Sequence, residues 1–94
     1  RRICRLAMQW TGPDNPLIIY RHFHHSHEYY TDYTCTPNIE KPAEVAALLE
    51  ARRRPSYLLT EGKAVGDLDQ VSGWRRTVVA EAGRSVLVKL ERMP

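Results

Sequence analysis

The sequence has little of what marks specialised protein classes. Two cysteines among 94 residues are too few for a disulfide scaffold or a cysteine-rich zinc site. No apolar run approaches the roughly 20 residues of a membrane-spanning helix, and no stretch has the pattern of a signal peptide. The five glycines form neither G-x-G-x-x-G nor P-loop spacing, so we expect no nucleotide site of those types.

The sequence also has no large excess of positive or negative charge. Fourteen Lys and Arg against 11 Asp and Glu give a formal charge of +3, too small an excess to predict nucleic-acid binding. With 43% hydrophobic and 27% charged residues, the composition is that of a globular domain rather than a disordered or collagen-like chain. The length predicts a single domain over residues 1–94. We expect it to be a soluble α/β domain, for reasons given below. Because the chain opens on Arg1 without methionine, we expect a piece excised from a longer protein.

The two cysteines leave one question open. Cys4 and Cys35 can form a single bridge in an oxidising compartment. They can equally be two half-buried thiols, because a sequence gives no Cα separation with which to test a bridge.

Two short apolar runs predict the centre of a sheet. Leu17–Tyr20 and Ser56–Thr60 are bounded by turn residues, which is typical of strands buried on both faces. Between them, Pro42 at a first helical position and Glu44 in the first turn open the clearest helix, which Pro55 ends. Its apolar stripe comprises Val45, Leu48 and Leu49.

Weaker patterns complete the expected architecture. A helix is predicted from Ile3 to Trp10, a short edge strand at Tyr33–Thr36 and a short helix at Ala64–Ser72. Two closing strands, Trp74–Glu81 and Ser85–Glu91, are joined by a turn with glycine. This order predicts an α/β three-layer sandwich: a mostly parallel mixed sheet with helices on its faces and a C-terminal antiparallel hairpin.

The most conspicuous polar segment runs from His22 to Glu28. On a helix, His24, His27 and Glu28 converge on one face, and imidazole and carboxylate are good ligands for zinc, nickel or copper. The spacing matches no established metal motif, and one local tract lacks the remote ligand that usually closes a site. These three residues are therefore weak metal candidates, and we expect no bound metal and no cofactor.

The same segment follows a predicted central strand. Loops after the carboxyl ends of parallel strands are where α/β sheets most often bind ligands. We therefore expect His24, His25 and His27, with Tyr29 and Tyr30, to contact a substrate or a membrane portion. Burying several histidines requires partners for both ring nitrogens of each, so at least two should be exposed to solvent.

No residue of the chain is expected to be catalytic. Ser26, His27 and Asp32 lack the strained elbow of a hydrolase triad, and Cys35 lacks a nucleophile context. The basic clusters Arg52–Arg54 and Arg75–Arg76 are interpreted as compensating a helix end and as solvated faces. Their functional alternative is contact with phosphate, above all lipid head groups.

Five segments carry a resemblance to a known family. They are Pro16–Arg21, Glu28–Thr31, Pro42–Leu49, Pro55–Thr60 and Gly83–Leu90. In chain order, these segments resemble five parts of one C-terminal domain. The parts are a strand, an aromatic passage, a leucine-rich helix, a strand with a tyrosine-leucine-leucine sequence, and the closing strand. That domain is the soluble extracytoplasmic part of bacterial integral-membrane glycosyltransferases of the aminoarabinose transferase and protein mannosyltransferase group.

The resemblance implies a function for a longer parent protein. The parent would be a glycosyltransferase using a polyprenyl-phosphate-linked sugar, with catalytic carboxylates outside this chain. This domain would lie on the periplasmic face of the inner membrane against the transmembrane portion, with lipid-linked sugar or lipid head groups as further partners. The alternatives are a stand-alone metal- or ligand-binding module organised around His22–Glu28, and a small nucleic-acid-binding domain. The weak basic excess disfavours the last.

Overall fold

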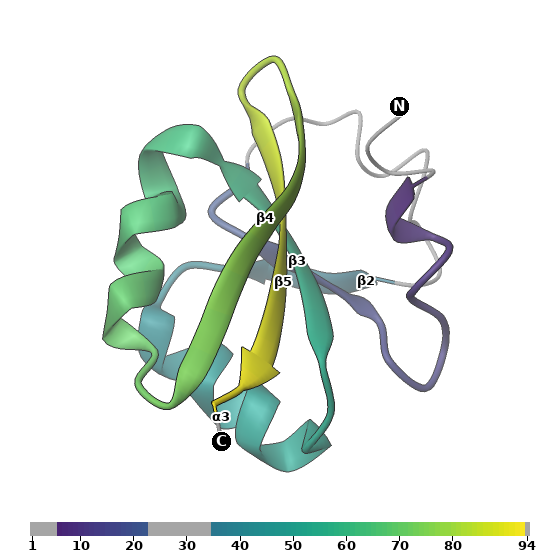
Figure 1. The fold of residues 1–94 in the computed structure, drawn as a ribbon, viewed down its shortest axis with the longest axis vertical. Helices are drawn as coiled ribbons and strands as arrows, with labels where there is room; N and C mark the ends of the chain where they lie inside the picture. The colour runs from purple at the N-terminus through teal and green to yellow at the C-terminus, as the bar shows by residue number, and fades with distance from the viewer. Residues whose placement is uncertain (1–5, 23–34, 94) are drawn as a thin grey trace.

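The computed structural model describes residues 6–22 and 35–93, which form an α/β domain around a five-stranded mixed sheet (Figure 1). The strands are β1 (Leu17–Tyr20), β2 (Cys35–Ile39), β3 (Ser56–Glu61), β4 (Trp74–Ala82) and β5 (Ser85–Arg92). The helices are α3 (Pro42–Arg52) and the 3₁₀ helix η2 (Gly62–Gln70). Within the described ranges, no helix has the length and apolarity needed to cross a membrane.

The strand order is β2-β1-β3-β5-β4. β1 pairs in parallel with β2 and β3, whereas β5 pairs antiparallel with β3 and β4. The sheet is therefore mixed, as the sequence predicts: its two parallel pairings lie on one side of β3 and its two antiparallel pairings lie on the other. Gly83, with φ of +60°, stands first in the two-residue turn between β4 and β5. Glycine adopts that backbone conformation without strain.

β2 occupies an edge of the sheet, where a proline is tolerated. Pro37 has no N–H to donate, and an edge strand has one side without a partner strand. The register shifts between Leu17 and Ile19. There the backbone N–H of Ile19 donates to the Thr36 hydroxyl at 3.0 Å, so a side chain replaces one ladder hydrogen bond.

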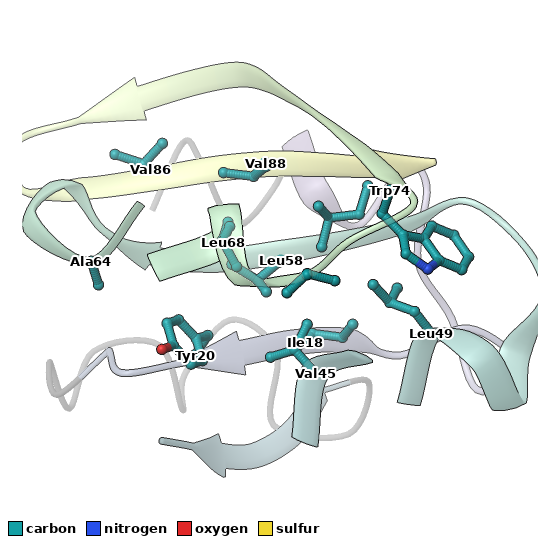
Figure 2. Packing of buried hydrophobic residues seen from close by; sticks show 12 residues of the cluster. Ile18, Tyr20, Val45, Leu49, Leu58, Ala64, Leu68, Trp74, Val86 and Val88 are labelled. Carbon is teal, nitrogen blue, oxygen red and sulfur yellow. The ribbon is translucent and has the colours of Figure 1, made fainter. Parts of the chain in front are cut away.

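One face of the sheet carries the larger apolar cluster, to which both α3 and η2 contribute (Figure 2). The cluster comprises Ile18, Tyr20, Val45, Leu49, Leu58, Ala64, Leu68, Val71, Trp74, Val86, Val88 and Leu90. Side chains of β5 alternate between the two faces of the sheet: Val86, Val88 and Leu90 lie in this cluster, while Leu87 lies in the other. Burial of these side chains is the main stabilising contribution to the fold.

The opposite face carries a smaller cluster. It contains Leu17, Ile19, Leu59 and Leu87, with Ala7 and Tyr57. The segment from Leu6 to Trp10 begins as a helix and ends in a turn, and it covers part of this face. Trp10 stacks on Tyr57 with the ring centroids 4.9 Å apart and the planes at 10°, an arrangement that stabilises beyond the buried area.

The two helices differ in type: α3 is an α-helix and η2 is a 3₁₀ helix. α3 begins with Pro42 at its first position and ends where Arg53 adopts a left-handed φ of 56° and donates to the Leu49 carbonyl. Val45 and Leu49 are buried as the apolar pattern predicts. The short helix predicted at Ala64–Ser72 is the 3₁₀ helix η2, which begins two residues earlier, at Gly62.

Candidate functional site

The carboxyl ends of two central strands lie at one edge of the sheet. β1 and β3 are parallel, so His22, two residues after β1, and Glu61, the last residue of β3, lie at the same edge. β5 runs the other way and begins there with Ser85, which lies directly opposite Glu61. We call this region the carboxyl edge. It is where α/β sheets most often bind ligands.

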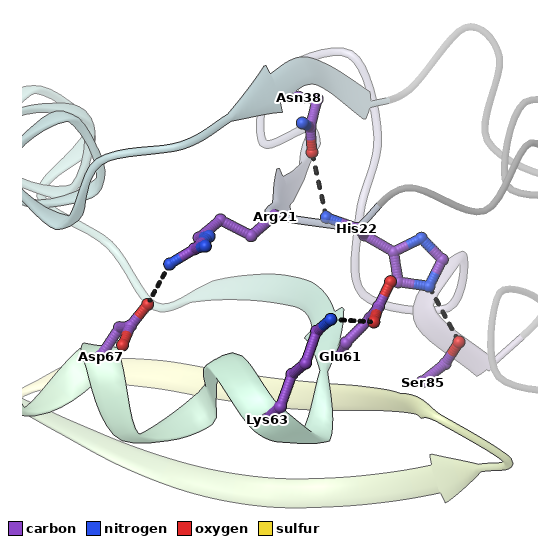
Figure 3. Close-up of polar contacts among 7 residues, drawn as sticks. All are labelled: Arg21, His22, Asn38, Glu61, Lys63, Asp67 and Ser85. Atoms are coloured by element: carbon purple, nitrogen blue, oxygen red, sulfur yellow. Dashed lines mark hydrogen bonds and ion pairs between the residues drawn. The ribbon is translucent and has the colours of Figure 1, made fainter.

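His22 is held firmly at the carboxyl edge (Figure 3). The residue is 3% exposed, and its Nε2 lies 2.8 Å from the Ser85 hydroxyl. Its backbone N–H donates to the Asn38 side chain at 3.1 Å. The preceding residue, Arg21, has a left-handed φ of 45° and donates its N–H to the Ile39 carbonyl at 2.8 Å. These contacts fix the direction in which the chain leaves β1.

A carboxylate and an ammonium group lie at the same edge. Glu61 is 7% exposed, and its Oε1 is 3.8 Å from Lys63 Nζ, whose side chain reaches back from the start of η2 toward Glu61 (Figure 3). Both residues line a cleft of about 400 Å³ between η2 and the β4–β5 turn. The carboxylate of Glu61 and the ammonium group of Lys63 therefore face this cleft, whereas His22 and Ser85 lie beside it at the same edge and do not line it.

A second polar group lies beside this edge. The Tyr20 hydroxyl donates to Asp67 Oδ2 at 3.0 Å, and Arg21 Nη1 lies 3.0 Å from the same oxygen. Burial is the main reason that the pKa of Tyr20 is raised, and the hydrogen bond and charge of Asp67 raise it further. This arrangement ties β1 to η2 and favours the neutral phenol.

The raised pKa of Tyr20 predicts a loss of stability in alkali. Its contribution is fully present below the ordinary pKa of 10.0 and is lost as pH rises through the raised value in the folded state. We expect the Tyr20→Phe variant to show a shallower fall in the free energy of unfolding above about pH 10. Urea unfolding at a series of pH values measures this slope. An Asp67→Asn variant, which lowers the Tyr20 pKa, should give an intermediate slope; equal slopes in all three proteins would contradict the prediction.

One arginine of each basic cluster makes side-chain contacts within the domain. Arg52 donates to Asn15 Oδ1 at 3.2 Å and to the Ser56 hydroxyl at 3.4 Å, which fixes the end of α3 against the start of β3. Arg76 lies 2.6 Å from Asp69 and donates to the Val65 carbonyl. Arg52 and Arg76 therefore hold elements of the domain together.

The sequence-predicted site residues lie mostly outside the described residues. His24, His25, His27, Glu28, Tyr29 and Tyr30 all belong to residues 23–34, for which the structure gives no description. Of the His22–Glu28 segment, only His22 is described. Among residues 6–22 and 35–93, no group of three histidine, cysteine or carboxylate side chains is placed to hold a metal ion.

The structure adds residues that sequence reasoning missed. The sequence predicts no role for Glu61, Lys63 or Ser85: the first two follow the predicted strand Ser56–Thr60, and Ser85 begins another predicted strand. The signal that pointed to His22 also applied to Glu61 and Lys63, because they too follow a buried central strand. Ser85 had no such signal, because its position depends on the antiparallel pairing of β5 with β3.

No protein family model matches the chain, and comparisons with curated proteins and with solved structures find no match. The function is therefore argued from the carboxyl edge and from the sequence.

Proposed function

We propose that this chain is a non-catalytic extracytoplasmic domain of a bacterial membrane glycosyltransferase that uses a polyprenyl-phosphate-linked sugar. The domain helps cover or shape the donor or acceptor site. The resemblance of five segments suggests the parent enzyme, and one structural observation supports the orientation. His22 is anchored by Ser85 and Asn38, so the segment bearing His24 to Tyr30 starts from a fixed point on the carboxyl edge.

The proposal includes the surroundings of the domain. Its partners are the transmembrane portion of the same chain and lipid-linked sugar or lipid head groups, at the periplasmic face of the inner membrane. Histidines gain positive charge as pH falls between about 8 and 5, which strengthens contact with anionic lipid or phosphate. The segment after His22 then acts as a contact surface and needs no metal.

The finer architecture belongs to the same proposal. A three-layer sandwich has a second helical layer on the face opposite α3 and η2, and its final strands form a hairpin. Leu6 and Ala7 pack against that opposite face, which supports the second layer. The antiparallel pairing from Trp74 with Arg92 to Ala82 with Ser85 supports the hairpin.

The test uses the full-length parent protein in membranes. Replacing His24, His25 and His27 together by alanine should lower kcat/KM for sugar transfer from the polyprenyl-phosphate donor about tenfold. That change corresponds to the loss of about 1.4 kcal/mol of contact energy. The deficit should grow as pH is lowered from about 8 to 5, because the native histidines gain charge over that range.

A matched control is available at the other end of the sheet. Arg53 and Arg54 precede the amino end of β3, so a double alanine variant there should leave transfer unchanged. The 94-residue chain alone should transfer no sugar. Unchanged donor use, acceptor use and membrane association in the triple variant across the whole pH range would refute the proposal. Tight, stoichiometric zinc or nickel binding would favour the alternative, a stand-alone metal-binding module.

A further inference from the structure

The cleft at the carboxyl edge has the size of a small-ligand site. It occupies about 400 Å³, within the range of about 300–1,000 Å³ usual for such sites. We call it the turn cleft, because the start of η2 forms one wall and the β4–β5 turn the other. It is lined by Glu61, Gly62, Lys63, Glu81, Gly83, Arg84 and Val86.

The charges of the turn cleft are balanced, and two of the four groups, Glu81 and Arg84, form no ion pair within the described residues. Lys63 and Arg84 supply two cations, and Glu61 and Glu81 supply two carboxylates. Lys63 is 3.8 Å from Glu61, longer than a hydrogen bond. The cleft therefore presents positive and negative groups to one small space.

This charge pattern selects for a dipolar ligand. A simple anion attracted by Arg84 meets the two carboxylates, and a simple cation attracted by Glu81 meets Lys63 and Arg84, so each is partly repelled. A zwitterion satisfies both signs at once. The planar guanidinium fork fits two oxygens of a phosphate or of a carboxylate. We take phosphate as the anionic group, because its charge of about −1.5 to −2 engages both Lys63 and Arg84.

The turn itself leaves room for such a ligand. Gly83 has no side chain, and a Cβ placed on it meets nothing within 4 Å. Gly62 carries no side chain on the opposite wall, where a Cβ would make only an ordinary contact of 3.8 Å with Val86. The two glycines therefore add no side-chain bulk to the cleft, and a hydrogen bond of 2.9 Å from the Gly62 N–H to the Arg84 carbonyl joins its two walls.

We propose that the turn cleft binds an aminoalkyl phosphate of the phosphoethanolamine class. The phosphate lies against Arg84 and Lys63, and the ammonium group lies against Glu81. The source is either a soluble metabolite or the head group of an ethanolamine phospholipid. This inference goes beyond the proposed function, because it rests on the described residues alone and its test involves no sugar transfer.

The test is an NMR titration of the ¹⁵N-labelled 94-residue chain. Phosphoethanolamine should shift the amides of Gly62, Lys63, Gly83 and Arg84. It should bind at least about tenfold more tightly than inorganic phosphate or ethanolamine, because only the zwitterion makes both charge-assisted contacts. Arg84→Gln and Glu81→Gln should each raise Kd about tenfold, whereas Arg53→Gln, in a separate arginine-lined hollow, should not.

Vesicle sedimentation distinguishes the two sources. A lipid head group predicts binding to phosphatidylethanolamine vesicles that is lost in Arg84→Gln and is weaker with phosphatidylcholine, whose quaternary ammonium has no N–H to donate. Binding of free phosphoethanolamine without vesicle binding supports the soluble source. The inference is overturned if inorganic phosphate binds as tightly as phosphoethanolamine, or if millimolar phosphoethanolamine shifts no turn-cleft amide. It is also overturned if the folded Arg84→Gln variant binds normally.

Discussion

The Leu58→Ala variant should have a free energy of unfolding about 2–5 kcal/mol lower than the parent, as expected when a fully buried leucine is truncated. Leu58 lies on β3, between β1 and β5, and none of its surface is exposed. Its side chain lies at the centre of the cluster in Figure 2. A domain of this kind has only about 5–15 kcal/mol of stability in total, so this truncation removes a large fraction. Urea denaturation measures the change.

The exposed edge of the sheet supplies the control. Val78, on β4, is 45% exposed, so Val78→Ala should cost less than about 1 kcal/mol. If Leu58→Ala is no more destabilising than Val78→Ala, the assignment of β3 to the centre of the sheet is wrong.

The His22→Ala variant should cost about 2–3 kcal/mol, although His22 belongs to no helix or strand. The substitution removes a ring that is 3% exposed and leaves the Ser85 hydroxyl without the Nε2 partner 2.8 Å away. Ser85 is half-buried, so its unsatisfied hydroxyl costs about 1 kcal/mol, at the low end of the range for buried groups, and the empty volume left by the ring supplies the rest. Thermal and urea unfolding both report the loss.

A double-mutant cycle isolates this hydrogen bond. Ser85→Ala alone should cost about 1 kcal/mol, and the double variant should lose about 1 kcal/mol less than the sum of the two single variants. Strict additivity would show that the contact contributes nothing to stability. The carboxyl edge would then lack the anchor on which the proposed orientation of the following segment depends.

The central elements could be predicted because their signals are local. Leu17–Tyr20 and Ser56–Thr60 are continuous apolar runs, and all their residues are buried in the sheet. The α3 helix follows from Pro42 and the spacing of Val45 and Leu49. The alternation in β5 assigned its side chains to the correct faces, because a period of two residues is a property of the strand alone.

The arrangement of the strands could not be predicted in the same way. Periodicity shows which face a side chain occupies, but it does not show which strand lies beside it. The insertion of β5 between β3 and β4 depends on pairings such as Leu58 with Val88, which are distant in sequence. The 3₁₀ geometry of η2 was also beyond prediction, because a weak apolar pattern does not distinguish 3₁₀ from α-helical turns.

The candidate site, like the fold, could be predicted only where its signals are local in the sequence. Sequence reasoning pointed to the edge of the sheet at which His22 lies, because the polar tract follows a buried strand. It placed the main contacts in residues 23–34, which are not described, and it gave no role to Glu61 or Ser85. The contact of His22 with Ser85 spans 63 positions in the chain, and no local pattern encodes a partner at that distance.

The position of β5 inside the sheet has a consequence for how the chain folds. β5 is the last strand to be synthesised among those described, yet it lies between two earlier ones. On the ribosome, β3 therefore keeps an unpaired side, and β4 has no neighbour, until residues 85–92 have emerged. Pairings between distant segments form slowly, and unpaired strand edges promote aggregation in the meantime. We therefore expect a nascent chain stopped at Arg84 to remain protease-sensitive and to become resistant only after Arg92 has been added.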